Sequence, residues 1–367
     1  MGNNKSMRVL HVFEPRTGGV PIFVSQLAHD MRGTGMDVTL LGPSEFCEHQ
    51  LIPARGILAM IRNAVRCQRL MRKLRPEIVH AHSFFAGIFV RAFCLRGCAV
   101  VYSPHAWVFY RGGVVGRIGL YVEAVLARRT HGFLFVSKAE QGDAPRGVSS
   151  RLAVVAGVPV SKKFLDARSV DQSHARSAVG IEHAGPAAVC VGRITAQKGQ
   201  DRLIALARQA SSQAVRFYLV GPVEEPELIA NLPSNVISVG PTDLAEMWFR
   251  AADVVLMPSR WEGLPIAAIE ALSCGVCVVA SDITSFVELA RRIPRHRDSG
   301  LLMLVDEVDF QLLDLSVVDV ARAGRPLRDQ AMDEEFEQFT PASVSSHVVS
   351  LYKQVLSNYD PVRASSP

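Results

Sequence analysis

The feature that most constrains this chain is an alternation of strand-like and helix-like segments that starts twice. Residues 8–13 (RVLHVF) are short, apolar and rich in β-branched or aromatic side chains, as expected of a buried parallel strand. Residues 20–35 then repeat apolar side chains at helical spacing, and residues 36–42 return to the strand pattern. The alternation restarts at residues 187–193 and continues to residues 276–281. Two doubly wound α/β domains are therefore predicted.

The domain boundary is expected where this pattern stops. A chain of 367 residues favours two domains over one. The strand pattern is lost between residues 157 and 186. We predict a first domain over residues 1–160, a second over residues 161–345, and a C-terminal helix and tail over residues 346–367. In sheets of this kind ligands bind at the carboxyl ends of the strands, which is where candidate residues are sought.

Two candidates follow predicted strands in the first half. Gly18 and Gly19 open a helix, where backbone N–H groups can approach an anion. Taken alone, the pair of glycines favours a plain tight turn without a ligand. His105 ends the segment 99–105 and is either a polar site residue or a capped loop residue. No G-x-G-x-x-G or G-x-x-x-x-G-K-[ST] pattern is present, which argues against NAD and ATP as ligands.

A third candidate is the loop Gly192-Arg193-Ile-Thr-Ala-Gln-Lys198-Gly199. An arginine supplies a planar fork of donors and a lysine a compact charge, so Arg193 and Lys198 can converge on a diphosphate. The alternative is an ordinary exposed basic loop.

The fourth candidate is WEGLPIAAIEALSCG, residues 261–275, with two glutamates eight positions apart. Pro265 fits a first helical turn, so a helix is expected to begin there, with Glu262 before it and Glu270 inside it. In a helix, eight residues give about 800° of rotation and about 12 Å of rise. Retaining glycosidases hold their carboxyl groups only about 5–5.5 Å apart, so these glutamates are interpreted as separate contacts on one extended ligand.

Metal-binding patterns are weak in this sequence. Cys274 and Cys277 have zinc-like spacing, but no second pair accompanies them and no Asp-x-Asp follows a predicted strand. We therefore predict buried cysteines and no essential metal. Seven cysteines, an odd number in a long chain, favour a reduced, cytoplasmic protein.

At these residues the sequence resembles the retaining glycosyltransferases of the GT-B fold, glycosyltransferase family four. The resemblance covers most of the chain. It includes "VVYSPHAW", "FVSKAE", "AVCVGRITAQKGQDRLI", "FYLVGP" and the long segment from "VISVGPTDLAEMWF" to "EALSCGVCVVASD". It implies two Rossmann-like domains facing across a cleft, with the C-terminal helix crossing back to the first domain.

The resemblance also implies roles for the candidates. The catalytic set would be His105, Arg193, Lys198 and Glu262, with Arg193 and Lys198 neutralising the diphosphate in place of a metal. The contacts to the nucleotide sugar would come from Gly18, Gly19, Arg193, Lys198, Glu262, Gly263, Leu264, Pro265, Ile266 and Glu270, the last on the ribose. No cofactor is implied, and a UDP-sugar is the expected substrate. Two alternatives remain open: an epimerase or phosphorylase of the same architecture, and a non-catalytic GT-B binding protein.

Charge is unevenly distributed along the chain. Residues 1–157 carry 20 Lys and Arg against 9 Asp and Glu, whereas the remainder carries 20 against 26. Residues 55–75 hold seven basic residues and no acid, with apolar side chains at helical spacing. Such a helix either binds an anionic membrane or covers the sheet with a solvated basic face. We predict a lipid-linked or polysaccharide-precursor acceptor, a location in the cytoplasm with possible peripheral attachment to the membrane, and no nucleic-acid partner, because no nucleic-acid motif is present.

Overall fold

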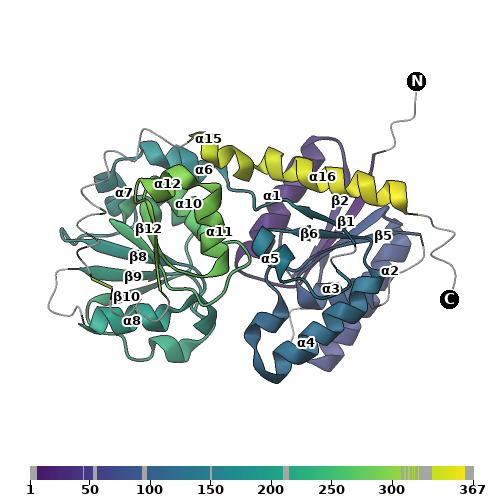
Figure 1. Cartoon of the computed structure of the whole chain (residues 1–367), viewed down its shortest axis with the longest axis horizontal. Coiled ribbons are helices and arrows are strands. Elements are labelled where there is room, and N and C mark those ends of the chain that lie inside the picture. The colour runs from purple at the N-terminus through teal and green to yellow at the C-terminus, as the bar shows by residue number, and fades with distance from the viewer. Residues whose placement is uncertain are drawn as a thin grey trace. The chain divides into compact units, whose positions relative to one another are not determined.

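The structure, a computed structural model, describes residues 6–43, 45–52, 56–92, 97–148, 151–209, 215–306, 310, 313–314, 316, 318, 321 and 333–359. Residue 55 of the predicted basic stretch and residues 360–367 of the predicted tail lie outside this set. Contacts divide the chain into two compact units (Figure 1). Unit 1 comprises Met1–Pro159 with Pro341–Pro367, and unit 2 comprises Val160–Thr340.

Unit 1 is built on a parallel sheet with the strand order β3-β2-β1-β4-β5-β6-β7. Its strands are β1 (Arg8–Phe13), β2 (Asp37–Gly42), β3 (His49–Gln50), β4 (Ile78–His82), β5 (Ala99–Ser103), β6 (Gly132–Phe135) and β7 (Leu152–Val155). Its helices are α1 (Gly19–Gly33), α2 (Ile57–Leu74), α3 (Phe84–Arg91), α4 (Gly113–Leu126), α5 (Lys138–Gly142) and α16 (Pro341–Asn358), with short 3-10 turns η1 (Val108–Arg111) and η2 (Ala127–Arg129).

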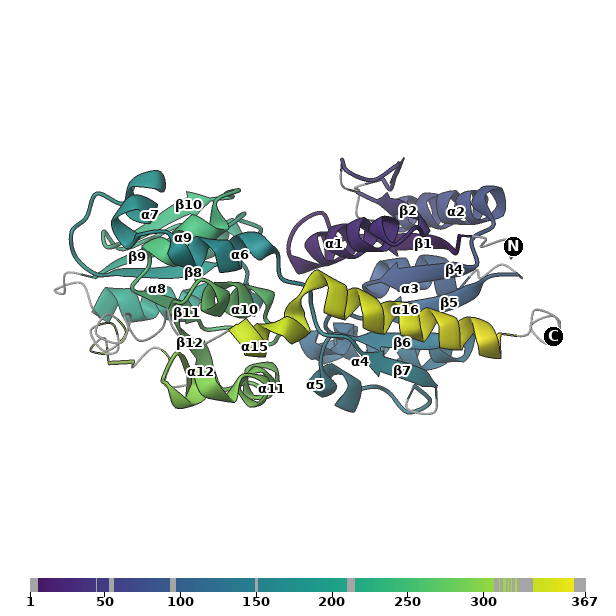
Figure 2. The same cartoon turned by 90° about the horizontal axis from the view of Figure 1, so that it is seen from above.

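Helices cover both faces of this sheet. Leu10 and Val12 of β1 pack into a core that includes side chains of α2 and α3. His11 lies between them in the strand and therefore faces the opposite side. That side meets α16, which runs along the strands of unit 1 (Figure 2) and contacts α1, β5, β6 and β7. The approach is close, because a Cβ on Gly132 of β6 would lie 2.6 Å from Val355 of α16.

Unit 2 is built on a second parallel sheet with the order β10-β9-β8-β11-β12-β13. Its strands are β8 (Ala187–Val191), β9 (Arg216–Val220), β10 (Val236–Gly240), β11 (Val254–Met257), β12 (Cys277–Ser281) and β13 (Leu302–Val305). Its helices are α6 (Lys162–Asp166), α7 (Gln172–Ala178), α8 (Gln200–Gln209), α9 (Ala245–Ala251), α10 (Ile266–Ser273), α11 (Thr284–Arg292), α12 (Pro294–Asp298) and α15 (Asp333–Phe336), with 3-10 turns η3 (Ala167–Ser169), η4 (Ala196–Lys198), η5 (Pro226–Ile229) and η7 (Glu337–Phe339).

The predicted α/β architecture with two parallel sheets is confirmed. The last helix begins at Pro341, so the predicted boundary at residues 345 and 346 falls inside α16. Proline suits the first position of a helix, because its missing N–H would have no partner there. Among the described residues, no helix combines the length and apolar composition needed to cross a bilayer.

Candidate functional site

The loop from Gly192 to Gly199 is shaped by backbone approaches that only glycine permits. A Cβ on Gly221 would lie 2.1 Å from the carbonyl oxygen of Gly192, and a Cβ on Gly199 would lie 2.0 Å from that of Pro258. Gly199 also has a positive φ of 70°. The loop is thereby held against the exits of β9 and β11. As a result Lys198 is carried to the segment that joins β11 to α10.

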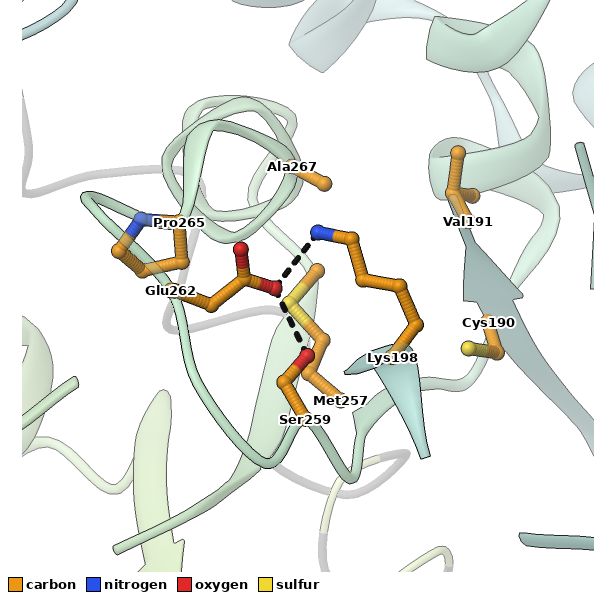
Figure 3. Close-up of a pocket in the computed structure, with 8 residues that line it drawn as sticks. All are labelled: Cys190, Val191, Lys198, Met257, Ser259, Glu262, Pro265 and Ala267. Atoms are coloured by element: carbon orange, nitrogen blue, oxygen red, sulfur yellow. Dashed lines mark hydrogen bonds and ion pairs between the residues drawn. The ribbon is translucent and has the colours of Figure 1, made fainter. Parts of the chain in front are cut away.

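Lys198 and Glu262 form an ion pair in a small pocket of unit 2 (Figure 3). Lys198 Nζ lies 2.6 Å from Glu262 Oε1, and the Ser259 hydroxyl donates a 2.8 Å hydrogen bond to the same oxygen. Among the described residues Glu262 Oε2 has no hydrogen-bond partner, and Figure 3 shows it pointing away from Ser259. The remaining lining residues are Cys190, Val191, Met257, Pro265 and Ala267.

Arg193 lies on the same loop but outside this ion pair. Its Nη1 is 2.8 Å from Glu224 Oε2, and its Nη2 donates to Gln197 Oε1 at 3.3 Å. Gln197 in turn donates to the carbonyl oxygen of Trp261 at 3.1 Å. Arg193 thus has hydrogen-bond acceptors other than Glu262. Gln197 connects it to Trp261, the residue that precedes Glu262.

The two glutamates lie on different elements. Glu262 is in the loop after β11, and Glu270 is inside α10. The helix begins at Ile266 rather than at Pro265, which is its N-cap because its ψ of 86° is not helical. Gly263 and Leu264 complete the loop.

Glu270 is the most strongly perturbed acid of the candidate set. Burial raises the pKa of its carboxyl to about 8, and the charge of Lys163 only partly opposes this effect. Much of the Glu270 population is therefore protonated at neutral pH in the free protein.

In unit 1 the predicted glycine turn is present. Gly18 has a φ of 88° and forms the N-cap of α1, which begins at Gly19. Because this N-cap is a glycine, it has no side chain to accept a hydrogen bond from the first N–H groups of α1. An anion could bind to such a helix start.

His105, which is half-buried, lies at the end of a chain of hydrogen-bonded histidines whose other members, His82 and His11, are buried. The sequence analysis did not predict this chain. His82 Nδ1 lies 2.9 Å from His105 Nε2, and His82 Nε2 lies 2.8 Å from His11 Nδ1. Burial lowers the pKa of His11 and His105 to about 3 and that of His82 well below its usual value. All three imidazoles are thus neutral at pH 7. The sequence contained a signal for this cluster, because His80 and His82 are alternate residues of β4 and therefore share one face of the sheet.

His80 joins the cluster through a different pair of partners. Its Nδ1 lies 2.7 Å from the Tyr352 hydroxyl of α16, and its Nε2 lies 2.8 Å from the Ser103 hydroxyl. One nitrogen each from His11, His80 and His82 lies within 4.8 Å of the others, a spacing that could hold a metal ion. The expectation of no essential metal stays a prediction. The cysteines considered for that role, Cys274 and Cys277, are buried.

Two family models match the chain, one in each unit. Residues 17–157 match Glycosyltransferase Family 4, and residues 185–313 match Glycosyl transferases group 1. Together the matches cover about three quarters of the chain. A Klebsiella pneumoniae protein described as an uncharacterized 41.2 kDa protein in the cps region is 25% identical over 309 residues, which span 77% of this chain and 83% of the relative. The lipopolysaccharide core biosynthesis mannosyltransferase LpsB of Rhizobium meliloti is 31% identical over 166 residues, 42% of this chain and 45% of its own.

Solved structures share the fold at low sequence identity. The sucrose-phosphate synthase of Thermosynechococcus elongatus superposes with a TM-score of 0.75 at 17% identity, covering 96% of this chain and 100% of that one. Anabaena Alr3699/HepE, solved in complex with UDP and glucose, gives 0.74 at 18% identity, covering 95% and 99%. With both halves matched by family models and this fold shared, the chain belongs to the GT-B glycosyltransferases of family four, group 1.

Proposed function

We propose that the protein transfers a sugar, with retention and without a metal ion, from a nucleotide-diphosphate sugar to an acceptor of polysaccharide or lipopolysaccharide assembly. The observation that carries the proposal is the pairing of Lys198 with Glu262 in the pocket beside the Gly192–Gly199 loop. Two similar proteins support it: Anabaena HepE was solved with UDP-glucose, and LpsB of Rhizobium meliloti is a lipopolysaccharide core biosynthesis mannosyltransferase. A UDP-sugar is the proposed substrate.

In this proposal the diphosphate is stabilised by side chains alone. An ammonium group has three N–H donors, and Lys198 uses one of them on Glu262. The others would serve oxygens of the leaving diphosphate, where negative charge grows during the reaction. The Arg193 fork would exchange Glu224 for phosphate oxygens, since bidentate contacts to phosphate are strong.

The sugar and nucleoside would be held by the remaining candidates. Glu262 Oε2 would accept a sugar hydroxyl, and Glu270 would accept the ribose hydroxyls. His105 would contact the sugar from unit 1. Backbone N–H groups at the start of α1 and at the entrance of α10 would approach phosphate and sugar oxygens, namely those near Gly18, Gly19, Gly263, Leu264, Pro265 and Ile266.

Lys198→Ala and Glu262→Ala test the assignment. Each is expected to lower the transfer rate by roughly 10²-fold or more, the size of effect seen when a stabiliser of developing charge is removed. Lys198→Ala should also weaken UDP binding, measured by calorimetry. Arg208→Ala is the control, because this arginine of α8 is exposed and, among the described residues, donates only to the Asn231 carbonyl oxygen. Unchanged nucleotide-sugar affinity in both site variants would refute the proposal.

The stereochemistry and the reaction class need separate measurements. NMR of the first-formed product should show the anomeric configuration of the donor sugar, and a chelator should leave the rate unchanged. Formation of an epimerised or free sugar at full rate without any acceptor would instead identify an epimerase or hydrolase.

We also propose that unit 1 contacts an anionic membrane that carries the acceptor. The inward side of α2 is buried, but Ile57, Ile61 and Val65 stay exposed at a spacing of four residues. Exposed arginines lie beside them at positions 62, 66 and 69. Helix α4 adds a second exposed apolar set, Val114, Val115, Ile118, Leu120, Tyr121 and Val125. Basic side chains near an anionic surface contribute about 1 kcal/mol each, and apolar side chains add to this by insertion.

Vesicle sedimentation tests this surface. The protein should bind phosphatidylglycerol vesicles and detach at high salt, while phosphatidylcholine vesicles bind little. Ile61→Glu and Ile118→Glu should weaken binding, and Ile237→Glu, at an exposed position of β10 in unit 2, should not. Equal partition onto neutral and anionic vesicles would count against the proposal.

A further inference from the structure

The turn that carries His105 has a backbone conformation that residues other than glycine rarely adopt. His105 has a φ of 55° and Ala106 a φ of 96°, and neither is glycine. A Cβ makes positive φ unfavourable, so such residues persist only where surrounding contacts impose them. Both residues follow directly on the exit of β5, at the end of the sheet where ligands bind in this class of fold.

The contacts that impose this conformation converge on Glu140 of α5. Its Oε1 accepts the Ala106 N–H at 2.6 Å, and its Oε2 accepts the Val136 N–H at 2.9 Å. Glu140 is 1% exposed, so these hydrogen bonds to an ionisable group are shielded from water. The carboxyl thus ties the exit of β5 to the exit of β6.

Glu140 is itself fixed on both sides. Its own N–H donates to the Ser137 hydroxyl, the N-cap of α5, at 3.0 Å. Its carbonyl oxygen accepts the Trp107 indole N–H at 2.7 Å, and Trp107 is 2% exposed. The residue is therefore a rigid brace between the turn and the helix that follows β6.

The imidazole of His105 is held separately from the backbone. Its Nε2 lies 2.9 Å from His82 Nδ1, and the Phe23 ring packs edge-on against it with the centroids 4.8 Å apart. For the ring to keep this contact with β4, the turn must keep its positive φ values. The backbone brace and the ring contact therefore depend on each other.

We infer that Glu140 is a positioning residue for His105, acting through the strained His105-Ala106 turn. Without the brace, the turn relaxes to an ordinary φ and His105 moves away from His82. The role of His105 in sugar transfer rests on the proposed function, whereas the mechanical link between Glu140 and the turn does not.

The test exploits the fact that glycine adopts positive φ without penalty. Glu140→Gln places an amide N–H₂ where one backbone N–H needs an acceptor, so kcat should fall by roughly tenfold or more, as misplacement of a site group does. The affinity for UDP should change little, because the residues proposed to contact the nucleotide lie mainly in unit 2. Adding Ala106→Gly should return kcat to within about threefold of wild type. The matched control is Ser83→Gly, which relaxes another positive φ, 73°, at the exit of β4 and should rescue nothing.

A second readout is independent of activity. In protein labelled with ¹⁵N-histidine, the hydrogen-bonded imidazole proton shared by His82 and His105 should give an NMR signal. Glu140→Gln should abolish this signal, and Ala106→Gly should restore it. If Glu140→Gln does not fold, Ala106→Val, which keeps Glu140 but penalises positive φ more heavily, should give the same two losses.

The outcomes separate the two proposals. Rescue by Ala106→Gly but not by Ser83→Gly supports the inference. An unchanged signal and rate in Glu140→Gln, or equal effects of the two glycine substitutions, would overturn it, as would an Ala106→Val variant that behaves like wild type. Absence of transferase activity in the wild-type protein would refute the proposed function, and the NMR signals would still decide the inference.

Discussion

Glu270 links stability to pH at the scale of a single side chain. Its pKa in the folded protein is about 8, against 4.5 for an ordinary glutamate, because burial disfavours the carboxylate. Between these values the folded protein keeps a proton that the unfolded chain has lost. The unfolding free energy therefore falls as the pH rises from 4.5 to 8. Glu270 thus lowers the stability of the fold at neutral pH, and its presence in α10 is consistent with a functional role.

Glu270→Gln should remove this dependence. The difference in unfolding free energy, variant minus wild type, should rise by about 1.4 kcal/mol per pH unit. The rise should begin above pH 4.5 and end near pH 8, the pKa of Glu270 in the folded protein. Denaturant unfolding at pH 5 and pH 8.5 measures the difference, with Glu334→Gln as the exposed control. In the proposed role, UDP binding should weaken at the same time. A difference between variant and wild type that is the same at both pH values would contradict the assignment.

His11 imposes the opposite dependence. Burial lowers its pKa from 6.5 to about 3, so between these values the unfolded chain binds a proton that the folded protein excludes. The unfolding free energy therefore falls as the pH drops from 6.5 towards 3. His11→Phe should cost less stability at pH 5 than at pH 7.5, and His29→Gln, at an exposed position, should show no such difference. An equal cost at both pH values would show that His11 does not exclude the proton.

The loop that carries Lys198 makes a prediction at the scale of an element. In Gly199→Ala the new Cβ would meet the Pro258 carbonyl oxygen at 2.0 Å, and φ would remain near 70°. The positive φ alone costs about 1–2 kcal/mol, and the clash must also displace the loop. Gly180→Ala is the matched control, because its φ is 73° and no atom of the described residues lies within 4 Å of the new Cβ. Only Gly199→Ala should lower transferase activity and UDP affinity, and equal losses in both variants would refute the role of the close approach.

The elements show what a single sequence can and cannot predict. The β1–α1–β2 unit and the separation of Glu262 from Glu270 were predicted, because strand and helix periodicity are local properties. Strand β7 was missed, since its residues Leu152–Val155 are half buried and carry a weaker pattern. The Lys198–Glu262 pair joins residues 64 positions apart and depends on the close approach at Gly199. No spacing rule gives that distance.

At the scale of the whole molecule, the chain returns to unit 1 after unit 2 is complete. Helix α16 buries Val344, Val348, Leu351, Tyr352 and Val355. Tyr352 reaches His80 from 272 residues away along the sequence, and this hydrogen bond belongs to the histidine cluster beside His105. Helix α16 therefore completes the core of the first unit, and the stability of unit 1 depends on residues that follow unit 2 in the sequence.

Leu351→Ala should act on one unit only. Leu351 is 0% exposed, and truncating a buried leucine costs about 2–5 kcal/mol. Because the helix packs on β5, β6 and β7, amide hydrogen exchange should accelerate in those strands and remain unchanged in β8, β11 and β12. Gln354→Ala, at an exposed position of the same helix, should leave both sets unchanged. Faster exchange in both units would mean that they unfold as one cooperative body rather than as two.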